Sequence, residues 1–118
     1  ILVVDDEPDL AAGLCSILEM RGHRTQMAHT QKEALGKATF FSPTAALVDL
    51  RLNNEDGTDV AQALREKFPN INIVYMTGYS SLLPTIAATT NDTVLKKPFE
   101  IDAAIAALTK DKSHANNN

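Results

Sequence analysis

Short apolar runs that alternate with amphipathic stretches constrain the fold of this chain more than any other feature of its sequence. Such runs occupy Ile1–Val4, Ala45–Val48, Ile71–Met76 and Thr93–Leu95. An uninterrupted apolar run of this length is typical of a strand that is buried on both faces, as in a parallel sheet. The shorter and more polar stretch Thr25–Ala28 is expected to form an edge strand.

Helical spacing of apolar residues separates these strands. The first helix is expected to begin at Pro8, with Asp6 or Glu7 near its N-cap, and to end at Arg21-Gly22. Its expected inward face consists of Leu10, Leu14, Ile17 and Leu18. A capping box of Thr30 and Glu33 opens the second helix. The expected inward faces of the three remaining helices are Ala34, Leu35 and Ala38, then Val60, Ala61, Leu64 and Phe68, and finally Ile101, Ala104, Ile105 and Leu108.

Five strands that alternate with helices predict an α/β fold, a doubly wound five-stranded parallel sheet of flavodoxin-like order 2-1-3-4-5 with helices on both faces. At 118 residues the chain fits one domain, expected over residues 1–110. The polar residues 111–118 are expected to be a flexible tail or the start of a linker. Between residues 79 and 91, Pro84 interrupts a helix-like pattern, so a brief or irregular helix is expected there. Because the chain begins inside a strand, we expect it to belong to a longer protein.

Composition excludes several classes of function. The net charge is −4, so no basic surface is available for direct binding to nucleic acid. No apolar run reaches the length of a membrane span and no signal peptide is visible, so a cytoplasmic protein without membrane contact is expected. The single cysteine, Cys15, excludes an internal disulfide and is expected to be a buried structural thiol.

The predicted strands end on residues that can do chemistry. Asp5 and Asp6 follow the first strand, Asp49 the third, Thr77 the fourth and Lys97 the fifth. Since the carboxyl ends of parallel strands share one edge, these side chains are expected to surround one acidic pocket. Two carboxylates about 4 Å apart repel by about 4 kcal/mol at an effective dielectric constant of about 20, so a cation is expected between them. Oxygen ligands with room for water suit Mg²⁺.

Together these residues resemble the receiver domain of two-component response regulators. The match runs from Val-Val-Asp-Asp-Glu-Pro at the start, through Asp49 and Asp56-Gly57, to Met-Thr-Gly and Lys-Lys-Pro-Phe near the end. Each motif is common by itself, but the set in this order and at these spacings is highly specific. The resemblance implies a signalling domain that takes a phosphoryl group from a histidine kinase or a histidine phosphotransfer domain and relays it as a conformational change. Catalysis is then limited to its own phosphoryl transfer and autodephosphorylation.

The resemblance also implies residue roles. Asp49 is the expected phosphoacceptor, forming an acyl phosphate. Mg²⁺ is expected to be bound by Asp6 directly, by Asp5 mainly through water, by Asp49, and by the backbone carbonyl of Arg51. Lys97 and Thr77 are expected to hold phosphoryl oxygens, and Thr77 to couple phosphorylation to the face made by helix four, strand five and helix five. That face is the expected contact with an output domain or a second copy of the chain. Lys97-Pro98 is expected to be a cis peptide.

Three positions depart from the family pattern. Val94 stands where an aromatic switch residue is common in strand five, so an aromatic switch is not expected. Asn53 replaces a usual proline after Asp49, which predicts a looser turn, and Pro84 falls in helix four. Arg51 and Tyr79 occupy places that tune dephosphorylation in the family, and we expect an effect without predicting its direction.

Other interpretations stay open. Asp49 alone could cap the next element, Thr77 could be an ordinary turn hydroxyl, and Lys96 is expected to be solvated, as are His23, His29 and His114. A degenerate receiver could act as a phosphorylation-independent binding module. A small phosphohydrolase is less favoured, because that class typically carries its nucleophile in an Asp-x-Asp motif, whereas Asp5 and Asp6 are adjacent. A flavin carrier is disfavoured because acids after the first strand would repel phosphate.

Overall fold

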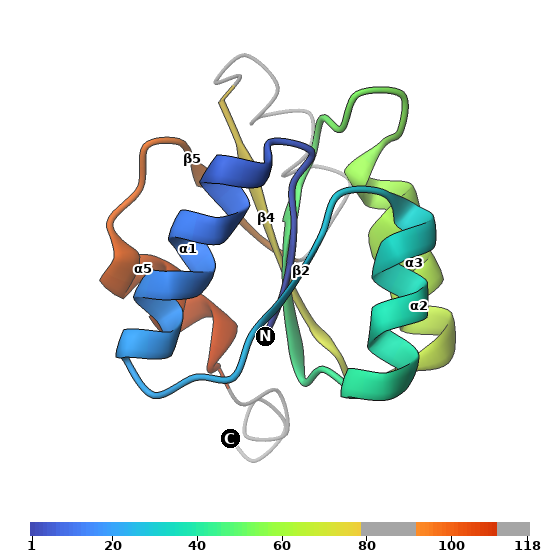
Figure 1. Cartoon of the computed structure of the whole chain (residues 1–118), viewed down its shortest axis with the longest axis horizontal. Coiled ribbons are helices and arrows are strands. Elements are labelled where there is room, and N and C mark those ends of the chain that lie inside the picture. Colours follow the sequence, from blue (N-terminus) through green and yellow to red (C-terminus); the bar gives the residue numbers. More distant parts are fainter. Residues whose placement is uncertain (79–91, 111–118) are drawn as a thin grey trace.

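The computed structural model describes residues 1–78 and 92–110 as a parallel sheet between two pairs of helices (Figure 1). Along the chain the elements are β1 (Leu2–Val4), α1 (Pro8–Met20), β2 (Gln26–Ala28), α2 (Gln31–Phe41), β3 (Ala45–Asp49), α3 (Gly57–Lys67), β4 (Asn72–Thr77), β5 (Thr93–Lys96) and α5 (Ile101–Leu108). The five strands are parallel, in the order β2-β1-β3-β4-β5. The predicted fold class and strand order are therefore confirmed. The expected helix near Pro84 and the expected tail at 111–118 lie outside the described residues.

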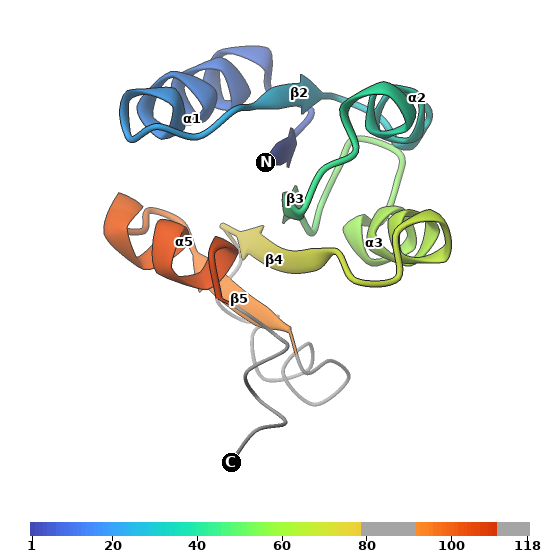
Figure 2. The same cartoon turned by 90° about the horizontal axis from the view of Figure 1, so that it is seen from below.

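The two faces of the sheet bury separate hydrophobic clusters. Figure 2 shows α1 and α5 on one face and α2 and α3 on the other. Because side chains alternate along a strand, neighbouring residues of β1 enter different clusters: Val3 faces α1 and α5, while Leu2 and Val4 face α2 and α3. This two-sided burial explains why the strands β1, β3 and β4 read as continuous apolar runs. The edge position predicted for β2 is confirmed.

The predicted inward face of α1 is partly wrong. Leu18 is buried as expected and Leu14 is half-buried, but Leu10 and Ile17 are 37% and 41% exposed. The residues that α1 buries together with Leu18 are Ala11 and Cys15. Small side chains at these positions let the helix approach the sheet closely, and the larger leucine and isoleucine then flank the contact. The thiol of Cys15 is buried as predicted, and burial raises its pKa.

Local capping fixes the helix ends. The predicted capping box forms in modified form, because the Thr30 hydroxyl accepts from the Glu33 amide at 3.1 Å but the Glu33 carboxylate accepts from His29 N at 3.3 Å. At the start of α1, Glu7 occupies the N-cap position without a side-chain cap. Asn72 of β4 anchors the α5 helix. Its side-chain amide donates to the carbonyl of Ala107 at 2.7 Å and to the carbonyl of Leu108 at 3.1 Å.

An ion pair ties α3 to the beginning of β5. Arg65 of α3 pairs with Asp92, which immediately precedes β5, and also contacts the hydroxyl of Tyr75 in β4. Burial and the charge of Asp92 raise the pKa of Tyr75. Tyr75 lies opposite Val94 in the β4–β5 ladder, so a buried aromatic side chain does stand next to the position where β5 lacks one. None of the helices in residues 1–78 and 92–110 combines the length with the apolar character that a membrane span requires.

Candidate functional site

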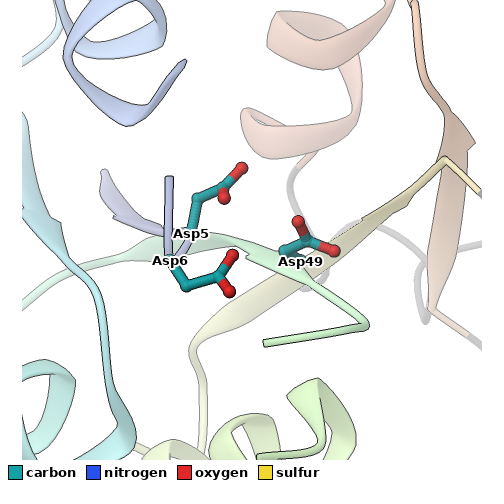
Figure 3. A group of neighbouring side chains, drawn as sticks. All are labelled: Asp5, Asp6 and Asp49. Carbon is teal, nitrogen blue, oxygen red and sulfur yellow. The ribbon is translucent and has the colours of Figure 1, made fainter. Parts of the chain in front are cut away.

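Three carboxylates gather where β1 and β3 end. Asp5 and Asp6 follow β1, and Asp49 is the last residue of β3. One oxygen from each carboxylate lies within 4.8 Å of the others (Figure 3). Asp5 is fully buried and Asp49 nearly so, while Asp6 is partly exposed. The sequence predicted this cluster, and the structure brings all three residues together because β1 and β3 are neighbours in register, with Val4 opposite Val48.

Lys97 bridges the two strands of the cluster. Its ammonium lies 2.8 Å from Asp49 Oδ2 and 3.2 Å from Asp5 Oδ2. Burial acts to lower the pKa of Lys97, but the hydrogen bond and charge of Asp49 and the charge of Asp5 prevail, so the pKa lies above its ordinary value. Lys97 is therefore a cation at neutral pH. Three carboxylates and one ammonium leave this group a formal charge of −2.

Backbone amides hold both buried carboxylates in place. Asp5 Oδ1 accepts from the amide of Glu7 at 3.0 Å, and Asp49 Oδ1 accepts from the amide of Arg51 at 3.0 Å. In each case the aspartate accepts from the amide two residues later, which orients one carboxylate oxygen and leaves the other toward Lys97. The alternative interpretation of Asp49 as a cap for the next element is wrong, because Asp56 caps α3 and Asp49 Oδ1 accepts from the amide of Arg51 in the loop. Asp49 Oδ2 faces the ammonium.

The end of β4 and the segment after β5 complete the edge. Thr77 is fully buried, and its carbonyl accepts from the amide of Lys97 at 2.7 Å. The ladder pairs Thr77 with Lys96, which is exposed as predicted. Lys97-Pro98 is a cis peptide, as predicted. Thr77 and Lys97 thus lie at the same edge of the sheet. Gly78, the residue after Thr77, lines a surface pocket at this edge.

A surface pocket of about 560 Å³ opens over the carboxylates. Its lining includes four of the predicted site residues, Asp6, Asp49, Arg51 and Lys97. The other lining residues are Glu7, Leu10, Leu52, Asn53 and Gly78. Leu10 was predicted to face the core, but it lines this pocket and is 37% exposed. The pocket makes the Asp49 carboxylate accessible from outside, although the residue itself is 7% exposed.

The first residue of α3 packs against the backbone that carries Asp49. A Cβ atom built on Gly57 would lie 2.1 Å from the carbonyl oxygen of Asp49 and 2.9 Å from Leu50 Cα. The Gly57 amide donates to the carbonyl of Leu50 at 3.0 Å. The Asp56-Gly57 pair noted in the sequence therefore has a physical reason. Asp56 caps α3 through the amide of Thr58, and Gly57 permits the close approach beneath Asp49.

Backbone hydrogen bonds close the loop between Asp49 and α3. The amide of Leu52 donates to the carbonyl of Glu55 at 3.2 Å, and Arg51 and Asp56 form an isolated antiparallel bridge. Asn53 therefore lies inside a loop that hydrogen bonds close, and the looser turn expected from the missing proline stays a prediction.

Two residues behind the carboxylates were missed by sequence reasoning. His29 was predicted to be a solvated surface residue, but it is half-buried and its Nδ1 donates to the Asp5 carbonyl at 2.8 Å. The carboxylate of Glu55 accepts from the amide of Gln31, at the start of α2, at 2.8 Å. Both contacts join residues 24 positions apart, so no local pattern could have indicated them.

Comparisons with known proteins agree with this arrangement. The family described as "Response regulator receiver domain" matches residues 1–109. The photosynthetic apparatus regulatory protein RegA of Rhodovulum sulfidophilum is 36% identical over 92% of this chain and 60% of its own length. The chain spans 60%, 48% and 57% of three curated relatives that it matches, so these relatives are longer proteins.

Solved structures give the same result. A response regulator from Burkholderia pseudomallei, solved with a phosphorylated aspartic acid, a calcium ion and citrate, is 31% identical with a TM-score of 0.82, covering 98% of this chain and 69% of that one. The response regulator TrrA of Thermotoga maritima, solved with Mg²⁺ and BeF, is 30% identical with a TM-score of 0.73, covering 88% of this chain and 90% of that one. With the match over residues 1–109, the strand order and the acidic pocket, the chain belongs to the receiver domains of two-component response regulators, which are phosphorylation-regulated signalling modules.

Proposed function

We propose that Asp49 is the residue of this chain that accepts a phosphoryl group from a phosphohistidine donor. The observation that carries the proposal is the position of Asp49 Oδ2, 2.8 Å from the Lys97 ammonium in a pocket open to the surface. Asp5 is fully buried, so it is poorly placed to meet a donor. Asp6 is more exposed, but it has no lysine contact comparable to that of Asp49 among the described residues.

The proposed step is an in-line displacement at phosphorus. A carboxylate oxygen of Asp49 forms the new bond while the bond between phosphorus and the nitrogen of the donor imidazole breaks, and the leaving imidazole takes up a proton. Lys97 exchanges part of its contact with Asp49 for a phosphoryl oxygen and so retains an anionic partner. Thr77 donates its hydroxyl to another phosphoryl oxygen. The resulting acyl phosphate is later hydrolysed by the domain itself, and catalysis is limited to these two reactions.

The donor set fits Mg²⁺. All three converging side chains offer carboxylate oxygens, and the formal charge of −2 matches a divalent cation. Asp6, which is partly exposed, would bind the ion directly, and buried Asp5 mainly through water, with Asp49 and the Arg51 carbonyl as further ligands. When bound, Mg²⁺ neutralises phosphoryl oxygens as their charge develops. The hydrogen bonds that the backbone amides of Glu7 and Arg51 donate would orient the carboxylates of Asp5 and Asp49 whether or not an ion is present.

The wider assignment extends from this site. Residues 1–110 form the receiver domain, and residues 111–118 lie outside the described residues. The greater length of the curated relatives supports an output domain elsewhere in the full protein, contacted through the face that includes β5 and α5. A second copy of the chain is the other candidate for that face. The phosphodonor is a histidine kinase or a histidine phosphotransfer domain, and the chain itself acts in the cytoplasm without membrane contact. Nucleic acid is not contacted directly.

Phosphorylation by a small donor tests the proposal. With acetyl phosphate and Mg²⁺, the intact mass is expected to rise by one phosphoryl group, and Asp49→Asn is expected to abolish the increase. Asp59→Asn is the matched control, since Asp59 is exposed in the first turn of α3 and lies outside the pocket. A wild-type protein that gains no mass would favour the binding module instead. Release of many phosphates per protein from a phosphate ester would favour the hydrolase.

A further inference from the structure

The carbonyl of Asp5 receives an unusual donor. The amide of Asp5 continues the β1–β2 ladder by donating to the carbonyl of Ala28 at 3.0 Å. In a regular parallel ladder the next donor, to the carbonyl of Asp5, would come from the backbone two residues after Ala28. β2 ends at Ala28, however, and the ring of His29 donates to that carbonyl from Nδ1 at 2.8 Å. Because a carbonyl can only accept, the proton must lie on Nδ1.

This contact fixes the peptide that joins the two acids. The carbonyl of Asp5 and the amide of Asp6 belong to one planar unit, so holding the carbonyl sets the direction in which Asp6 leaves the strand. The side chain of Asp5 is already held by Glu7 N and Lys97. His29 therefore adds a restraint on Asp6, the carboxylate that is partly exposed and lacks such a bridge to Lys97 among the described residues.

The segment that contains His29 and the start of α2 also holds the loop that follows Asp49. The carboxylate of Glu55 accepts from the amide of Gln31 at 2.8 Å, at the N-terminus of α2, where the helix dipole favours a negative charge. The carbonyl of Glu55 accepts from Leu52, which closes the turn that contains Asn53. Glu55 thus connects α2 to the backbone segment that includes Arg51.

A small pocket of about 310 Å³ lies between these contacts. It is lined by Asp6, His29, Thr30, Asn53, Asn54 and Glu55. Asp6 lines both this pocket and the larger one above the carboxylates. It therefore lies between the residues at the start of α2, His29 and Thr30, and the Asp49 site. Two sets of contacts therefore join the ends of β1 and β3. Lys97 contacts the carboxylates of Asp5 and Asp49. His29, just before α2, and Gln31, its first residue, contact the Asp5 carbonyl and the Glu55 carboxylate.

We infer that His29 and Glu55 are positioning residues of the metal and phosphoacceptor site. They act through the backbone, by holding the Asp5–Asp6 peptide and the loop after Asp49, and neither touches the phosphoryl group. This inference rests on the proposed function, because it assumes that Asp6 and the Arg51 carbonyl bind Mg²⁺. Replacing a residue that orients metal ligands without binding the metal commonly weakens metal binding by about 10- to 100-fold.

Magnesium titration with paired variants tests the inference. His29→Phe keeps a ring but loses the donor, and calorimetry is expected to give a dissociation constant for Mg²⁺ raised about tenfold. His29→Asn places an N–H donor two covalent bonds from Cβ, as in histidine. This variant is expected to recover most of the Mg²⁺ affinity. The corresponding pair at Glu55 is Glu55→Met and Glu55→Gln. Methionine removes the acceptor for the Gln31 amide and is expected to weaken Mg²⁺ binding, whereas glutamine keeps an acceptor and is expected to recover most of the affinity. His29→Phe with wild-type Mg²⁺ affinity would overturn the assignment of His29.

Lys37→Met is the matched control. Lys37 donates to the carbonyl of Met27 in β2 at 2.5 Å, which is the same kind of contact, a side chain to a strand carbonyl, but it lies outside both pockets at the carboxylates. Its loss is expected to lower stability without changing Mg²⁺ affinity. Equal loss of affinity in Lys37→Met and His29→Phe would mean that His29 has a merely structural role.

Amide exchange in the metal-free protein separates this inference from the proposed function. Without His29 the turn that binds Glu7 N to Asp5 is less restrained, and the Glu7 amide is expected to exchange about fivefold faster, as for the loss of one ordinary hydrogen bond. The Leu52 amide is expected to respond in the same way in Glu55→Met. Wild-type protein that does not bind Mg²⁺ would refute the proposed site, whereas unchanged exchange in both variants would refute the positioning role.

Discussion

Replacement of Gly57 by alanine is expected to disturb both stability and the phosphoacceptor. The new Cβ would lie 2.1 Å from the Asp49 carbonyl oxygen, 2.9 Å from the Asp49 carbonyl carbon and 2.9 Å from Leu50 Cα. Ordinary contacts between such atoms are about 3.5–4.0 Å. All three neighbours are backbone atoms, so no side-chain rotation can relieve the clash. Either α3 or the end of β3 must move.

The magnitude follows from two opposing terms. Overpacking in a close-packed interior costs about 1–3 kcal/mol, and displacement would also strain the 3.0 Å bond from Gly57 N to the Leu50 carbonyl. Alanine in a helix regains up to about 1 kcal/mol over glycine, and less at the first helical position. Because strain in the Gly57–Leu50 hydrogen bond roughly offsets this small gain, we expect Gly57→Ala to lower the free energy of unfolding by the overpacking cost, about 1–3 kcal/mol.

Gly36→Ala provides the opposite case in the same protein. Gly36 lies within α2 and is exposed, and a Cβ built there meets nothing within 4 Å. The helix-propensity term then acts alone, and this variant is expected to be about 0.5–1 kcal/mol more stable than the wild type. Urea unfolding followed by circular dichroism, with equal m-values, measures both differences.

The Gly57 variant should also react more slowly with acetyl phosphate. Movement of the Asp49 carbonyl shifts the carboxylate relative to Lys97, and a misplacement of about 1 Å can cost about 100-fold in rate. Gly36→Ala should react at the wild-type rate. The reasoning would be refuted if Gly57→Ala were as stable as Gly36→Ala and incorporated phosphate as fast.

Two further predictions concern stability. Because burial and Asp92 raise the pKa of Tyr75 above its ordinary value of 10.0, the phenol contributes stability that is fully present below about pH 10 and is lost as the pH rises through the folded-state pKa. In urea unfolding above pH 10 the wild type should therefore lose stability more steeply than Tyr75→Phe, and parallel curves would contradict this. Asn72→Asp should cost about 1–3 kcal/mol at neutral pH, because its carboxylate would face the carbonyls of Ala107 and Leu108 at the negative end of α5, and less in acid, where the protonated group can donate. An equal loss at both pH values would exclude this repulsion as the cause.

The strand order and the acidic edge could be predicted because they depend on patterns that repeat along the chain. Buried parallel strands must be apolar on both faces, so the runs that end at Val4 and Val48 identify β1 and β3 without knowledge of their neighbours. Once the order is set, the positions of Asp5, Asp6 and Asp49 follow, since residues after parallel strands meet at one edge.

Details that depend on close packing were not predictable. Helical spacing placed Leu10 and Ile17 inside, but the side of α1 that approaches the sheet uses Ala11 and Cys15. Spacing identifies apolar residues and does not measure how closely two backbones approach. Hydrogen bonds across the fold were missed for a related reason, since the partner of His29 is a backbone carbonyl 24 residues away, and any donor of suitable reach could have served.

The central claim is that Asp49 is the phosphoacceptor, and the most direct test is chemical identification of the modified residue. Protein treated with acetyl phosphate and Mg²⁺ is reduced with borohydride, which converts an acyl phosphate of aspartate to homoserine, and its peptides are then mapped by mass spectrometry. The account predicts homoserine at position 49 alone, dependent on Mg²⁺. Homoserine at position 5 or 6, or unmodified peptides throughout, would contradict it.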